Sequence, residues 1–119
     1  MMMRMASAGP GWRTLKIERQ LDLIAAPAIA GALFAAMAGT KSNLLIDLDA
    51  VDAADEFGVA ALIAAMAKVR ADHPSMRLFV VACRALLADS IVRDLPAGTA
   101  EVYRDRCAAH AAIATRAAA

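Results

Sequence analysis

Acidic side chains gather in one short segment of the sequence, between Asp47 and Gly58. Its five carboxylates are Asp47, Asp49, Asp52, Asp55 and Glu56. Carboxylate oxygens are the ligands that Mg²⁺ prefers in proteins, and an aspartate can also accept a phosphoryl group. A metal site or a phosphoryl-transfer site is therefore the first chemistry that this segment suggests.

Several of these acids also have an ordinary structural role available. Asp55 stands directly before a segment with helical periodicity, where an N-cap contributes about 1 kcal/mol. Glu56, in the first turn, would gain about 0.3–1 kcal/mol from the helix dipole. Asp22 precedes an earlier helical segment and could cap it in the same way. We therefore assign no catalytic residue, no metal ligand and no cofactor.

Strand-like and helix-like segments alternate along the 119 residues. Strands are expected at 14–21, 43–50, 78–83 and 100–104, from alternating or continuous apolar residues. Apolar residues at helical spacing, Ile24 among them, mark helices at 24–38, 56–72, 86–95 and 106–114. Such alternation is typical of a parallel sheet with helices packed against it. We predict one α/β domain over residues 14–115, with a mostly parallel sheet of four or five strands.

Residues 1–13 precede the first expected strand and carry the turn-forming run Ala-Gly-Pro-Gly. We expect this segment, which includes Trp12, to be a flexible leader or an edge strand. If the sheet edge stays open, a second subunit could pair with it, so a homodimer is one expected assembly.

Composition argues against several classes of partner. The net charge is +1 and aromatic residues make up 4% of the chain, so no basic surface for nucleic acid is expected. The longest apolar run, Ile24 to Ala38, is too short to span a membrane. Cys83 and Cys107 have no paired spacing and are interpreted as buried free thiols. We therefore expect a cytoplasmic protein without a membrane partner.

A receiver-type domain, dependent on phosphate and metal, is one alternative. It has a similar length and the same alternation of strands and helices. It requires an acidic pair after the first strand and a lysine at the end of a late strand. This chain has a single Asp22 at the first place, and Arg84 or Arg104 at the second.

Two segments resemble conserved blocks of STAS domains, the anti-sigma factor antagonist (anti-anti-sigma factor) family. Residues 15–22, Leu-Lys-Ile-Glu-Arg-Gln-Leu-Asp, resemble a block that ends in Gly-Glu-Leu-Asp. Residues 43–58 resemble a second block: an apolar strand, an Asp-Leu step, and Asp-Ser-Ser-Gly opening a helix. The strand at 78–83 and the helix at 86–95 follow at the family's usual distances, so the resemblance covers almost the whole chain.

The resemblance implies a non-enzymatic protein–protein regulatory module of bacterial transcription and signalling. In that family a partner kinase, itself an anti-sigma factor, phosphorylates the second serine, and the added charge of about −1.5 to −2 changes the docking surface. The implied partner is an anti-sigma factor or a related kinase-fold protein. The implied partner-binding residues are Asp22, Asp55, Glu56, Phe57 and Gly58. A STAS scaffold subunit of a signalling assembly is the alternative within the same fold.

The chain departs from the family pattern at four positions, which are Arg19, Gln20, Glu56 and Phe57. Phe57 occupies the usual serine position, so we expect no phosphorylation there. An aromatic side chain on this turn either packs into the core or offers a docking anchor. Glu56, at the first serine's place, suggests a fixed carboxylate that imitates the phosphorylated state. Arg19-Gln20 replaces Gly-Glu, which removes a glycine beside the junction.

Overall fold

The computed structural model describes residues 2–38 and 42–118, which form five strands and four helices. The strands are β1 (Met2–Gly9), β2 (Trp12–Leu21), β3 (Asn43–Ala54), β4 (Leu78–Val81) and β5 (Glu101–Tyr103). The helices are α1 (Ala26–Met37), α2 (Glu56–Asp72), α3 (Ala85–Asp94) and α4 (Arg106–Ala118). The predicted α/β fold with a mostly parallel sheet is confirmed.

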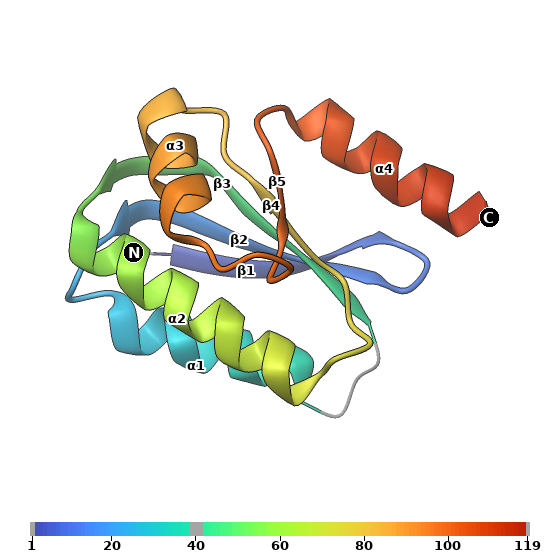
Figure 1. Cartoon of the computed structure of the whole chain (residues 1–119), viewed down its shortest axis with the longest axis horizontal. Helices are drawn as coiled ribbons and strands as arrows, with labels where there is room; N and C mark the ends of the chain where they lie inside the picture. Colours follow the sequence, from blue (N-terminus) through green and yellow to red (C-terminus); the bar gives the residue numbers. More distant parts are fainter. Residues whose placement is uncertain (1, 39–41, 119) are drawn as a thin grey trace.

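The sheet has the order β1-β2-β3-β4-β5. Only β1 is antiparallel to its neighbour, and the other pairs are parallel. The carboxyl ends of β2, β3 and β4 therefore share one end of the sheet, where the chain passes into α1, α2 and α3. Figure 1 shows α1 and α2 side by side along one face. In open α/β sheets this end is where binding sites usually lie.

The N-terminal segment contains the edge strand β1, joined to β2 by a tight turn at Pro10 and Gly11. Gly9 has a φ of +127° and Gly11 a φ of +75°, conformations that favour glycine. Of the two alternatives considered for residues 1–13, the structure contains the edge strand.

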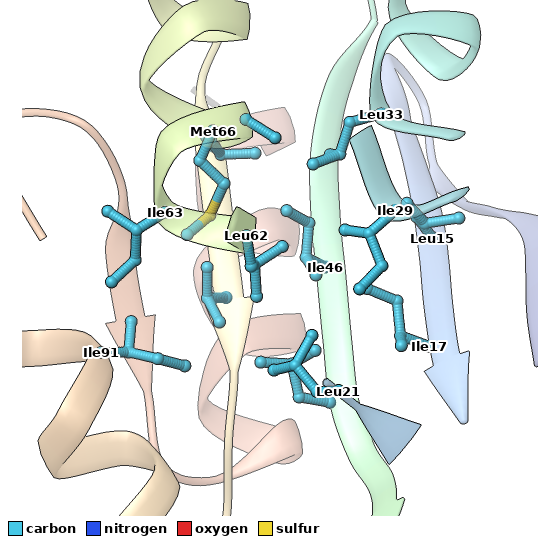
Figure 2. Close-up of a cluster of buried hydrophobic side chains, with 14 of the residues drawn as sticks. Leu15, Ile17, Leu21, Ile29, Leu33, Ile46, Leu62, Ile63, Met66 and Ile91 are labelled. Atoms are coloured by element: carbon cyan, nitrogen blue, oxygen red, sulfur yellow. The ribbon is translucent and has the colours of Figure 1, made fainter. Parts of the chain in front are cut away.

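The main core lies between the sheet and the helices α1, α2 and α3. Side chains at alternate strand positions point to this face, as expected for β-structure. Figure 2 shows members from five elements: Leu15 (β2), Ile46 (β3), Ile29 (α1), Leu62 (α2) and Ile91 (α3). All five are almost completely buried, and each contributes about 1.5–3 kcal/mol through removal from water.

A smaller core lies on the opposite face, beneath α4. The Trp12 ring lies 4.5 Å from the Phe79 ring, and Phe79 lies 5.0 Å from Tyr103, measured between ring centroids. Ala109 and Ile113 of α4 complete this cluster. Burial, together with a hydrogen bond to Glu101, raises the pKa of Tyr103 to about 12. Trp12, assigned from the sequence to the leader, is thus a core residue, because β2 begins there.

Pairing between strands shifts two element boundaries from their predicted places. β3 continues to Ala54 rather than ending at residue 50, because the last residues of β2 pair with Ala53 and Ala54 across two bulges. β4 ends at Val81, two residues before the predicted end. Among the described helices, none is both long and apolar enough to cross a bilayer.

Candidate functional site

Asp55 caps α2, as the sequence predicts. Its Oδ1 accepts a hydrogen bond of 2.7 Å from the Gly58 N–H, and its backbone is extended. The Asp55 N–H in turn donates to the Leu21 carbonyl oxygen at 3.1 Å. These two bonds fix the start of α2 against the end of β2.

Gly58 is required here because two backbone segments approach too closely for any side chain. A Cβ atom at this position would lie 2.0 Å from the Leu21 oxygen and 2.4 Å from the Asp22 nitrogen. Contacts under about 3.0 Å essentially never occur for a real Cβ. The contact brings the Leu21–Asp22 segment beside residues 55–58, so the structure places all five predicted partner-binding residues together.

Asp22 holds the turn before α1. Its Oδ1 accepts a hydrogen bond of 2.9 Å from the Ala25 N–H, and Pro27 lies in the helix's first turn. Ile24, assigned to the first helix from its helical spacing, precedes that helix and is 91% exposed. That assignment is wrong, because α1 begins only at Ala26. The position of Pro27 was the signal for the later start, since proline favours a helix's first turn.

Phe57 is 55% exposed, which excludes the alternative that it packs into the core. Its neighbours Gly58 and Val59 occupy the buried side of the same turn. Leu23 and Leu86 are also exposed, and sequence reasoning did not single out either of them. We call this region the junction surface; its members are Asp22, Leu23, Ile24, Glu56, Phe57 and Leu86.

A cavity of about 570 Å³ adjoins the junction surface between α2 and α3. Glu56 and Leu86 line it, together with the apolar side chains of Val51 and Leu87. Arg84, at the start of α3, donates from Nη1 to the carbonyl oxygens of Val51 at 3.0 Å and Asp52 at 2.5 Å. The Arg84 guanidinium thus ties α3 to the end of β3.

Asp47 and Asp49 do not join the junction surface. They point to the α4 face, where Arg106 Nη2 lies 3.1 Å from Asp47 Oδ2 and 3.2 Å from Asp49 Oδ2. Asp47 is only 7% exposed, so this ion pair compensates a carboxylate that has lost most of its water. Within residues 2–38 and 42–118, no group of three or more His, Cys, Asp or Glu side chains is placed to hold a metal.

Both cysteines are exposed, so their interpretation as buried thiols is wrong. Cys83 lies beyond the end of β4, and its N–H donates to Asp49 Oδ1 at 3.1 Å. A hydrogen bond between the Cys83 thiol and Asp49, helped by partial burial, raises the pKa of this thiol. Cys107 lies in the first turn of α4.

Arg19 has a φ of +73°, the one positive φ among the described residues other than glycine. It stands at a bulge of β2, where the family-like motif has glycine. The left-handed conformation costs a residue with a Cβ about 1–2 kcal/mol. The exposed Arg19 side chain is therefore accommodated at the expense of backbone strain.

Replacing Gly58 tests the close approach. We expect Gly58→Ala to lower the free energy of unfolding by about 3 kcal/mol or more, because backbone atoms must move to admit the methyl group. Gly31→Ala in α1 is the control: its Cβ would meet nothing within 4 Å. This control should stabilise the protein by about 0.5–1 kcal/mol. Urea unfolding measures both, and equal effects would contradict the packing described.

Replacing Arg19 tests the strain. We expect Arg19→Gly to raise the free energy of unfolding by about 0.5–1 kcal/mol, because glycine adopts this φ without a steric penalty. Gln20→Gly, at a neighbouring exposed residue with negative φ, should lower it by a similar amount. If both glycines destabilise the protein in thermal or urea unfolding, Arg19 is not strained.

Replacing Arg106 tests its role in attaching α4. We expect Arg106→Ala to cost about 1–2 kcal/mol in urea unfolding, because Asp47 stays buried without its ion-pair partner and the half-exposed arginine limits the loss. Arg104→Ala removes the exposed pair with Asp89 and should cost less than about 0.5 kcal/mol. An equal loss in the two variants would argue against a role of Arg106 in attaching α4.

Comparison with known proteins places this geometry in a family. The structure resembles the anti-sigma factor antagonist SpoIIAA in its unphosphorylated form, with a TM-score of 0.68 and 13% identity over 97% of this chain and 98% of that one. A variant of Moorella thermoacetica RsbS gives a TM-score of 0.69 and 15% identity, over 95% of this chain and 97% of that one. The murine Slc26a9 anion transporter gives a TM-score of 0.64 and 18% identity, over 90% of this chain but only 18% of the transporter.

At these identities the structural matches establish the fold. A search of curated proteins gave no match. The family model described as "STAS domain" matches residues 5–92, which include β2, β3 and the whole junction surface. The chain therefore belongs to the STAS domain family.

Proposed function

We propose that this STAS domain is a non-enzymatic regulatory module of the anti-sigma factor antagonist type, acting in the cytoplasm. In this proposal it binds an anti-sigma factor, or a related kinase-fold protein, through the junction surface. The observation that carries the proposal is the exposed Phe57 ring on the first turn of α2. The likeness to SpoIIAA and RsbS supports the choice of partner class.

The junction surface has the make-up of a protein-binding site. Leu23, Ile24, Phe57 and Leu86 are large apolar side chains exposed to water at the carboxyl end of the sheet. Covering each of them on binding yields up to about 1.5–3 kcal/mol. The caps at Asp22 and Asp55 hold the backbone of the first three, and Leu86 lies in the helix α3, so little ordering is needed when a partner binds. The cavity between α2 and α3 offers room beside them for a partner side chain.

The same surface lacks the hydroxyl on which phosphorylation at the usual site depends. Phe57 stands where the motif has its phosphoacceptor serine, so a partner kinase has no acceptor oxygen there. Binding is then constitutive, without release by phosphorylation at this residue. Glu56 contributes one fixed negative charge, on a side chain that leaves the helix about 100° away from Phe57.

Phe57→Ala tests the anchor. We expect it to weaken the affinity for the anti-sigma kinase at least about tenfold, since truncating a central aromatic commonly costs more than 1.4 kcal/mol. The measurement is calorimetric titration of each purified anti-sigma kinase of the source organism with the full chain. Val92→Ala, at an exposed apolar residue of α3 that does not line the cavity, should leave the affinity unchanged. If none of these kinases binds the wild-type chain, the scaffold alternative replaces this proposal.

A mass measurement after incubation with kinase and ATP tests the loss of the switch. We expect no phosphate on the wild-type chain and one phosphate on Phe57→Ser. A phosphate on the wild-type chain at another residue would overturn constitutive binding. Glu56→Ser is the companion variant: an unchanged affinity would end the idea that Glu56 imitates the phosphorylated state.

A further inference from the structure

The two edges of the sheet are built differently. β5 forms one edge and is only three residues long, whereas β1 forms the other and runs for eight residues. β1 pairs with β2 on one side, and the described part of the chain places no strand on its other side. The outer row of N–H and C=O groups of β1 is therefore a template for another strand.

β1 also lacks the features by which proteins usually protect an edge strand. Its sequence contains no proline, lysine or acidic residue, and its one charge is Arg4. The Arg4 guanidinium pairs with Glu18 of β2. The Arg4 side chain is therefore directed toward β2 and away from the open edge of the sheet. The one irregularity lies between Ser7 and Gly9, so the register is continuous from Met2 to Ser7.

Apolar surface reaches this edge and is left uncovered there. Met5 is the cross-strand partner of Leu15, so its side chain points to the face covered by α1. It is nevertheless 40% exposed, while Met3 on the same face packs partly against the core. Methionine adapts well to a neighbouring surface, which suits these positions to an interface.

We propose that β1 pairs with β1 of a second copy of this chain, antiparallel and about a two-fold axis at Met5. Such pairing is isologous, because the same residues of β1, Met2 to Ala8, serve both sides. Met5 then faces Met5 of the second copy, and Arg4 faces Ala6. An axis at Arg4 would instead place two arginines opposite each other, which is unfavourable. The result is a continuous sheet of ten strands.

The helix layer has room for this arrangement. α1 packs on β2, as Figure 2 shows for Ile29 beside Leu15. In the dimer the two α1 helices lie three strand spacings apart, about 14 Å. Helices in direct contact lie about 8–10 Å apart, so a gap remains between them. The Met3 and Met5 side chains of both copies fill that gap, which accounts for apolar residues at an edge.

Sedimentation velocity on the full chain, over a rising concentration series, tests the dimer. We expect a species of twice the 12.4 kDa chain mass. Met5→Lys should weaken dimerisation at least tenfold, because it sets two like charges face to face across the axis. Val92→Lys, at an exposed apolar residue of α3, should leave the dimer intact. Circular dichroism confirms that each variant is folded.

Disulfide trapping tests the register independently. The chain carries Met5→Cys with Cys83→Ser and Cys107→Ser, and copper–phenanthroline is the oxidant. Facing residues of antiparallel strands have Cα atoms about 4.5–5.5 Å apart, within the range that a disulfide bridges. We expect a covalent dimer, and none from Val92→Cys in the same background. A monomer at all concentrations, a dimer insensitive to Met5→Lys, or no crosslink at position 5 overturns the proposal.

Discussion

The first turn of α2 lies directly on the backbone at the end of β2, and this contact exists because residue 58 has no side chain. The Leu21 carbonyl oxygen occupies the space that a Cβ of Gly58 would need, and the same oxygen accepts a hydrogen bond from Asp55. The end of β2 and the start of α2, which are far apart in the sequence, are thereby held together. This contact determines where α2 begins and places Asp22 beside the first turn of α2. The arrangement of the other residues at this end of the sheet depends on it.

Strand geometry, rather than distance along the chain, decides what each acidic side chain does. Asp47 and Asp49 lie on alternate positions of β3 and therefore share the α4 face, where Arg106 compensates both. Asp55 lies just past the end of the strand and uses its carboxylate as a helix cap. A cluster in the sequence is thus divided between two faces, and its acids stabilise the fold at the places where water is excluded or helices begin.

Local patterns predicted much of this fold. Helical spacing and the Asp55 cap gave α2, and apolar runs located the strands. The errors fall where a distant partner decides the outcome. Trp12 is buried because Phe79 lies beneath it, and Cys83 is exposed because β4 stops pairing at Val81. Phe79 is far from Trp12 in the sequence, and β4 pairs with the distant strand β3. Local periodicity therefore contained no signal for either outcome. The sequence left the exposure of Phe57 undecided for the same reason, because that exposure depends on which side of the first turn of α2 faces β2.

Two of the departures from the family motif, Arg19 and Phe57, affect different contributions to the free energy. Arg19 stands where glycine is usual but keeps the backbone that glycine would favour, so the change is borne as strain in the folded state. Phe57 lies on a regular helical turn and is open to solvent, so it costs the fold little. It changes what a partner meets: an apolar ring in place of an acceptor hydroxyl. Because the contact at Gly58 holds the backbone of this turn, its side chains can change the chemistry of the surface without changing its shape.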